Sequence, residues 1–464
     1  MHIPIMTISG DTIDGLLIYL SILGILILVA TILRLKIPLL KKYYIPASLL
    51  AGIIGLILGP YFVGVIPTEI TSTWSNLSGK LIVLVFAPML MGKGKKTEGG
   101  VEFVKKVASS VSWSYLGCFV QYAVPLLMAV FILVPVFHVP ELFGVIVEAG
   151  WAGGHGTAAG MAAVYEEIGW LEGQSLAVTS ATFGLVYGIL GGVVLINIGV
   201  RKGWTACLGK ATDLENKENE LYVGERRPVD TRTSISSGVV DNLAFHAAIL
   251  SVAVFVGYLL NVGIKSLTGV SVAWFVTAMF GGLIVQQVLN RTSWGDAVDK
   301  AVFSRIQGIS LEFLVAGAVA SVNVSVVLEY AVPLLIQQGT MCFVMLFLNI
   351  WYARRTLGKY WFEQSMLLFG TFTGVAATGM LLLKTCDPEN QSDALTVYAG
   401  RAPFTSWAVG GGVITSMMPV WVNNYGALPV GLVSLVLSVI LFVFPMIIGH
   451  WHKQPLIDHR STTT

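Results

Sequence analysis

Long apolar runs recur along the whole 464-residue sequence, and they restrict the chain to folds that a lipid bilayer surrounds. About 20 apolar residues, rising 1.5 Å each, cross the hydrocarbon core as a helix. Only 12% of the residues are charged, which is too few to cover soluble globular surfaces. The net charge of +2 favours neither nucleic acid nor an acidic partner. We therefore predict an all-α polytopic membrane protein.

Eleven of the apolar runs are predicted to cross the membrane as helices. They lie near residues 13–33, 45–66, 79–92, 111–136, 174–200, 242–263, 269–289, 306–327, 330–352, 402–421 and 426–449. Two further runs, 141–164 and 363–383, are rich in glycine, threonine and alanine. Because glycine inside a helix costs about 1 kcal/mol relative to alanine, these two runs are poor candidates for continuous helices.

The lysine and arginine residues are distributed unevenly between the loops. If 141–164 and 363–383 each enter and leave the membrane on one side, 26 of the 28 basic residues share a side. Only Lys80 and Lys265 lie on the other side. Since basic residues concentrate in cytoplasmic loops, this distribution predicts two re-entrant segments, with the N-terminus outside and the C-terminus inside.

The order of elements before the polar stretch 203–241 is repeated after it, at an offset close to 220 residues. With five crossings in each half, the second half is upside down relative to the first. We therefore predict two inverted-topology five-helix repeats, each with a glycine-rich re-entrant hairpin, plus one extra C-terminal helix. The ranges are 1–202 and 242–422 for the repeats, 203–241 for a cytoplasmic linker, and 423–464 for the appended helix and cytoplasmic tail. This arrangement is typical of secondary transporters.

The first glycine-rich run contains the sequence GGHGT. Non-helical backbone at this depth is tolerated only where it is buried in protein or lines a watery cavity. Free amides at the start of the next half-helix suit a carboxylate, and free carbonyls at the end of the preceding one suit sodium. Close helix packing is the alternative role for such glycines. The substrate-binding candidates here are Gly153, Gly154, His155, Gly156 and Thr157.

The second run, GTFTGVAATG over 370–379, has the same character with more hydroxyl groups. The prediction for this run depends on its position, which is equivalent to that of the first run in the repeat. This position predicts that it enters from the opposite side of the membrane. Two such hairpins meeting tip to tip would form a gated path, while small-residue packing is again the alternative. The substrate-binding candidates are Thr373, Gly374, Thr378 and Gly379.

Several polar residues lie within apolar runs, where they are costly and indicate function. Arg401 is a candidate for a bidentate contact with a substrate carboxylate, and extension of its side chain to the interface is the alternative. Glu148, which precedes the first hairpin, is placed at its outer mouth. The ion-binding candidates are Thr179, Ser180, Thr182, Thr371 and Glu312.

Three motifs together resemble the bacterial glutamate:sodium symporter family, over about residues 1–422. They are GGHGT at Gly153–Thr157, the SATFGLV sequence from Ser180, and the KKYYIPA sequence from Lys41. The resemblance implies inverted halves with glycine-rich re-entrant loops and sodium-coupled uptake of glutamate across the bacterial inner membrane. It also implies Na⁺ as the coupling ion and a homodimer.

We therefore predict a sodium-coupled symporter that imports glutamate or a related small carboxylate by alternating access. A sodium/proton exchanger is the nearest alternative, but it would need a buried pair of carboxylates, and only Glu312 suggests one. An ion channel with re-entrant filter loops is less favoured, because filters are usually built from symmetric rings of carbonyls. The sequence contains no HExxH or GxSxG motif, so an enzyme is not predicted.

Overall fold

The computed structural model describes residues 10–38, 40, 45–91, 100–207, 233–268, 272–387 and 391–452. Within these ranges every regular element is a helix, and nine helical stretches are long and apolar enough to cross a membrane. The all-α polytopic class is therefore confirmed. The nine are Gly10–Lys36 (α1), Thr68–Leu90 (α4 and η1), Val101–Phe137 (α5, η2 and α6), Gly173–Lys202 (α10), Asn242–Leu267 (in α11), Lys300–Ala320 (α13), Ala331–Thr356 (α15, η7 and α16), Trp361–Cys386 (α17) and Ala427–Ile447 (α20). Most of the predicted linker, residues 208–232, lies outside the described part.

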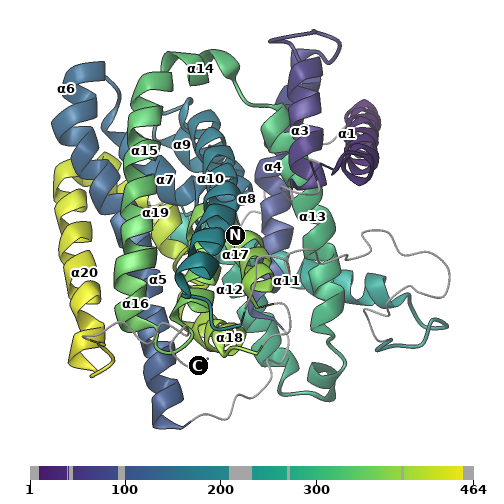
Figure 1. Ribbon diagram of the computed structural model, residues 1–464. Coiled ribbons are helices and arrows are strands. Elements are labelled where there is room, and N and C mark those ends of the chain that lie inside the picture. Colours follow the sequence, from purple (N-terminus) through teal and green to yellow (C-terminus); the bar gives the residue numbers. More distant parts are fainter. Residues whose placement is uncertain are drawn as a thin grey trace.

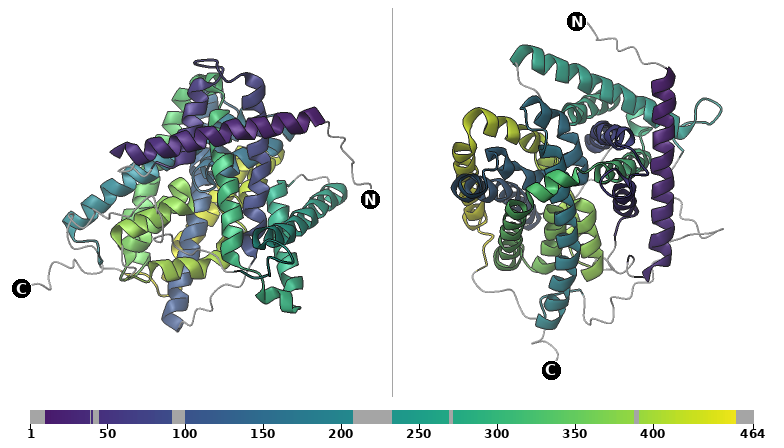
Figure 2. Two further views of the ribbon diagram at one scale, coloured as in Figure 1. Left: turned by 90° about the vertical axis from the view of Figure 1, so that its right-hand side faces the viewer. Right: turned by 90° about the horizontal axis from the view of Figure 1, so that it is seen from above.

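Two predicted spans are short helices. α3 (Ala47–Leu58) has 12 residues and α12 (Trp274–Leu289) has 16, so they extend about 18 and 24 Å, less than the hydrocarbon thickness of about 30 Å. α3 packs between α1 and α13, and α12 packs against α11 and α4. α1 itself lies across the outside of the bundle instead of parallel to its long helices (Figure 2).

The prediction of one helix over 402–421 is wrong. α18 (Ala394–Thr405) ends before this stretch is complete, and α19 (Val413–Tyr425) begins only after residues 406–412. Gly410 and Gly411 have φ of +67° and +103°, in the region that glycine adopts readily and other residues do not. The three consecutive glycines at 410–412 therefore interrupt the helix. We call residues 406–412 the α18–α19 break.

The first glycine-rich run, predicted over 141–164, falls in four short helices, the last of which ends at Glu167. They are η3 (Glu141–Val145), α7 (Ile146–Gly150), α8 (Gly154–Gly160) and α9 (Ala162–Glu167). The two ends of this run lie near opposite ends of one short helix, α14 (Val324–Glu329). At the first end, the ring of Phe143 stacks on Tyr330, and beyond the second end Ser175 accepts a hydrogen bond from the Asn323 amide. Phe143 and Ser175 therefore both contact residues that flank α14.

The second glycine-rich run lies within α17, where the chain reverses direction. Gly374 and Val375 have non-helical backbone angles. A Cβ atom placed on Gly370 would lie only 2.6 Å from the Cα of Gly379, whereas residues nine apart in a straight helix are about 13.5 Å apart. Glu363, near the start of α17, accepts hydrogen bonds from two backbone amides at 206–207, directly after α10. α17 is thus a helical hairpin whose tip is at 374–375.

α10 supports both runs. It packs against α7, α8 and α17, and these elements gather around it in the centre of the molecule (Figure 1). The first run lies beside the N-terminal end of α10, and the base of the α17 hairpin lies beside its C-terminal end. At mid-length, a Cβ on Gly184 or Gly188 would overlap atoms of Thr373, so these glycines admit the α17 tip. The two runs therefore reach the middle of α10 from opposite ends.

The glycine contact inside the α17 hairpin predicts a large effect on stability. A Cβ on Gly379 would overlap the Leu367 carbonyl oxygen, so Gly379→Val forces the two arms of the hairpin apart. We expect a loss of about 1–3 kcal/mol, the usual cost of overpacking, seen as a Tm several degrees lower in detergent. Gly339→Val in α15, where a Cβ meets nothing within 4 Å, should leave Tm nearly unchanged. Equal Tm values for the two variants would contradict this packing.

Candidate functional site

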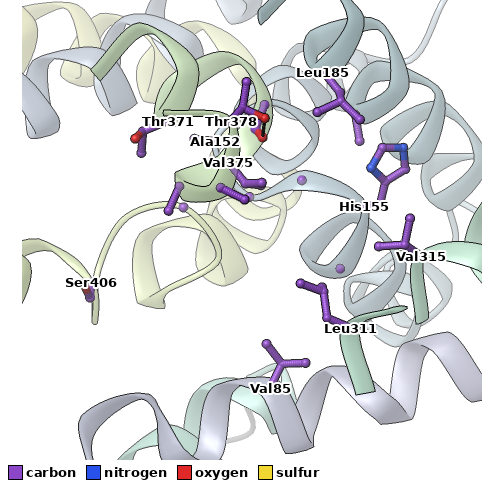
Figure 3. A pocket seen from close by; sticks show the side chains of 18 of the residues that line it. Val85, Ala152, His155, Leu185, Leu311, Val315, Thr371, Val375, Thr378 and Ser406 are labelled. Carbon is purple, nitrogen blue, oxygen red and sulfur yellow. Dashed lines mark hydrogen bonds between the residues drawn. The ribbon is translucent and has the colours of Figure 1, made fainter. Parts of the chain in front are cut away.

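A cavity of about 420 Å³ lies where the interrupted elements meet. Its walls come from the turn before α8, the α17 tip, α18 with the α18–α19 break, and the sides of α4 and α13 (Figure 3). Nine of the residues proposed from the sequence line it. They are Gly153, Gly154, His155, Gly156, Thr371, Gly374, Thr378, Arg401 and Glu312. The structure thus brings together residues separated by more than 240 positions in the chain.

The other candidates lie behind the cavity wall. Thr157, Thr373 and Gly379 are buried against neighbouring backbone, and Thr179, Ser180 and Thr182 lie on α10. Thr179 donates its hydroxyl to its own helix, at the Ser175 carbonyl, and Ser180 accepts a hydrogen bond from Gln338. No hydrogen bond joins any two of the five ion-binding candidates within the described residues.

The two tips touch each other at Gly154 and Val375. Gly154 has φ +70°, and a Cβ there would overlap Cγ1 of Val375. Val375 has φ +69°, which is a strained conformation for a β-branched residue. Such outliers persist only where the surrounding structure holds them, and they gather at binding and switching sites. The contact therefore leaves no space for a side chain at Gly154.

His155 holds the first tip against α10. Its imidazole is 7% exposed, and Nε2 lies 2.9 Å from Oγ1 of Thr182. Thr182 also donates to the Val178 carbonyl of its own helix, so the imidazole nitrogen is placed by a fixed partner. In Figure 3 the His155 ring lies at the wall of the cavity, below Leu185. His155 can therefore position the tip and present one ring edge to a ligand.

The hydroxyl groups of α17 bond mainly to their own helix. Thr371, Thr373 and Thr378 donate to the carbonyls of Leu367, Phe369 and Gly374, respectively. Thr378 bonds across the non-helical turn itself, at 2.5 Å, and so helps to fix the tip. Of these three threonines, Thr371 and Thr378 line the cavity, where a hydroxyl oxygen can still accept a hydrogen bond.

Arg401 is a buried cation in the wall of the cavity. It is 5% exposed, donates from Nη1 to the Ser114 hydroxyl at 2.5 Å, and stacks on the Tyr398 ring at 4.0 Å. Its Nε has no hydrogen-bond partner, and no carboxylate pairs with it in the described part of the chain. A desolvated guanidinium with free donors is suited to bind a carboxylate in a bidentate manner.

The expected position of Glu148 at an outer mouth is wrong, because its side chain is fully buried. The carboxylate accepts hydrogen bonds from the Tyr122 hydroxyl at 2.5 Å, the Gly410 amide at 2.9 Å and the Thr415 hydroxyl at 3.1 Å. Glu148 therefore joins α7 to the α18–α19 break. Sequence reasoning also missed the break itself, although the triple glycine at 410–412 was a local signal for it.

Apolar spans, paired interruptions and a mainly apolar cavity with a buried cation in its wall are features of multi-pass membrane transporters. The family model described as sodium/glutamate symporter matches residues 12–379. The chain belongs to the sodium/glutamate symporter family, whose members are cation-coupled. A search among curated proteins finds no match.

Among solved structures, the sodium proton antiporter MjNhaP1 from Methanocaldococcus jannaschii is similar over 93% of this chain and 98% of its own. The sequence identity is 16% and the TM-score is 0.39. A likeness at this level is too distant to indicate a shared mechanism. The assignment to the symporter family therefore rests on the family match over residues 12–379.

Proposed function

We propose that the protein imports glutamate, or a related small carboxylate, together with Na⁺ across the bacterial plasma membrane by alternating access. The observation that carries this proposal is Arg401, a buried cation without a carboxylate partner in the described residues, in the wall of the cavity between the two tips. A substrate carboxylate supplies the partner that the guanidinium lacks. The family match supports sodium and glutamate as the transported pair.

The contacts around the tips suggest how the substrate is held. One carboxylate pairs with Arg401, and the backbone of Gly153, Gly154 and Gly156 forms the opposite wall. Gly374 and Thr378 bound the site from the α17 side, and His155 lies at its edge. Alternating access requires the two tips to move relative to α10, and in this proposal substrate binding is therefore linked to the position of both tips.

The geometry also supports inverted repeats with re-entrant hairpins on opposite sides of the membrane. The first run begins and ends near the start of α10, and α17 begins and ends near the end of α10. The packing between halves is reciprocal, since α3 contacts α13 and α12 contacts α4. Arg201 and Lys202 end α10, so we place that end in the cytoplasm, with the N-terminus outside and the C-terminus inside. The proposal includes the homodimer implied by the family resemblance.

Uptake by purified protein in proteoliposomes tests this function. With an inward sodium gradient we expect glutamate uptake at least tenfold above that with an equal potassium gradient, because only sodium occupies the coupling site. Dicarboxylates without an amino group, such as malate, should be compared at the same concentration. Uptake of another carboxylate alone would exclude glutamate, and proton-driven movement of sodium without uptake of any carboxylate would favour the exchanger.

A further inference from the structure

We propose that the coupling cation binds just behind the cavity, among oxygen atoms of Glu148, Ala152, Thr157 and Thr415. We call these four residues the buried oxygen cluster. The inference rests on the proposed sodium-coupled function. It places the coupling cation among residues that do not include any of the five ion-binding candidates predicted from the sequence. The four residues come from α7, the turn before α8, α8 and α19, so the cluster forms only when these elements are packed together.

Glu148 supplies the negative charge of the cluster. Its side chain has no exposed surface, and its partners Tyr122, Gly410 and Thr415 are all neutral donors. The Cys118 thiol, at 3.7 Å, is neutral as well. Burying an ionised carboxylate within a membrane protein is costly without a compensating charge. A cation bound close by supplies that charge and keeps the carboxylate ionised. Oxygen ligands are those that hard cations such as Na⁺ prefer.

Thr157 supplies a free oxygen. Its side chain is fully buried, and Oγ1 has no hydrogen-bond partner. A Cβ on Gly411 would overlap this oxygen, so Thr157 reaches the break directly beside Gly410, whose amide bonds Glu148. A buried hydroxyl without a partner is costly, and it becomes satisfied when it ligates a cation.

The Thr415 hydroxyl and the Ala152 carbonyl place two further oxygen atoms beside Gly410 and Gly411. The Thr415 hydroxyl bonds the Glu148 carboxylate at 3.1 Å and accepts from the Gly411 amide at 3.0 Å. The Ala152 carbonyl oxygen lies 3.2 Å from the point where a Cβ on Gly410 would sit. Carbonyls of interrupted helices coordinate sodium in transporters of this general architecture. The cluster therefore offers a carboxylate, two hydroxyls and a carbonyl around one point of the backbone.

The position of the cluster explains how cation and substrate are coupled. Val409, Gly410 and Ala152 line the cavity, while Glu148 and Thr157 contact the break without lining the cavity. The break directly follows α18, which carries Arg401. A cation in the cluster fixes the break against α7 and α8 and thereby fixes the guanidinium that receives the substrate. Each ligand then raises the affinity for the other, as linkage requires.

Thr157→Val tests the inference, because valine keeps the shape and removes only the hydroxyl. We would measure Tm of the purified protein, without substrate, over a sodium chloride titration at constant ionic strength with choline chloride. The apparent sodium affinity should fall at least tenfold. Tm without sodium should be equal or higher, because the substitution removes an unpartnered buried hydroxyl. Thr157→Ser should restore sodium affinity to near that of the wild type.

Thr385→Val is the matched control, because the Thr385 hydroxyl likewise donates to its own helix, at the Leu381 carbonyl, and this variant should leave the sodium response unchanged. Wild-type sodium affinity in Thr157→Val, or no sodium-specific rise in Tm of the wild-type protein, would overturn the site. Glu148→Gln should also lose the sodium response, and the Thr157→Val and Thr157→Ser pair decides alone if that variant does not fold. Since no substrate is present, failure of glutamate transport would overturn the proposed function without affecting this result.

Discussion

Replacing Arg401 by glutamine should reduce sodium-driven glutamate uptake at least about 30-fold. The substitution removes the buried cation of the cavity, and losing one partner of a desolvated charged pair costs about 2–5 kcal/mol, which corresponds to roughly 30-fold to several thousandfold in affinity. Arg401→Lys keeps the charge but loses the planar fork and the stacking on Tyr398, so its uptake should remain well below that of the wild type. Initial uptake rates over a range of glutamate concentrations, at saturating sodium, measure both effects.

The control for Arg401 is Arg201→Gln, at the exposed end of α10, which should transport normally. The sodium-induced rise in Tm should persist in Arg401→Gln, since the guanidinium is not part of the buried oxygen cluster, and this persistence shows that the variant is folded. Substantial uptake by folded Arg401→Gln would exclude the guanidinium as the carboxylate site.

Gly154→Val should abolish uptake while leaving the protein able to insert and to be purified. The substitution places a side chain where Val375 already lies, and it forces a β-branched residue into the left-handed region at φ +70°. The two tips are then held apart, and the cavity wall that they share is lost. Uptake in proteoliposomes measures the loss of transport, and the yield of monodisperse protein shows whether the variant still inserts and can be purified.

Gly169→Val separates the clash from the backbone strain. Gly169 has φ +78°, nearly the same as Gly154, but a Cβ there meets nothing within 4 Å. Gly169→Val should therefore retain most of the uptake. Val375→Ala in the background of Gly154→Ala should recover part of the lost activity, because Val375 is the only residue in the described part of the chain that a Cβ on Gly154 would meet within 4 Å. Equal loss in the Gly154 and Gly169 variants would mean that strain alone, not tip contact, explains the result.

The sequence allowed prediction of the helical class and of both glycine-rich interruptions, because these depend on local composition. Gly153, Gly154, Gly156 and Gly374 disfavour a helix because of their residue type alone. The position of each tip could therefore be predicted from local sequence. The sequence also indicated that Arg401 would line a cavity, because a charged residue in an apolar run needs a polar environment.

The remaining features depend on contacts that a single sequence does not reveal. The break at 406–412 was missed because it lies within the apolar run 402–421, although it contains three consecutive glycines. The burial of Glu148 follows from donors 262 and 267 residues away, at Gly410 and Thr415. The short length of α3, in contrast, has a local signal in the sequence, since Pro46 precedes the helix and Gly59 and Pro60 follow it.

Successive turns of α5 hold two opposite charges. Ser114 bonds the Arg401 guanidinium, and Cys118, one turn later, lies against the Glu148 carboxylate. A unit charge that crosses a membrane potential of 100 mV exchanges about 2.3 kcal/mol with the electric field. The two charges belong to α18 and α7 and both lie against α5, so a movement that keeps these three helices packed together displaces no net charge from this pair. Under the alternating-access mechanism proposed above, we therefore expect this buried pair to add nothing to the electrical work of returning the unloaded protein.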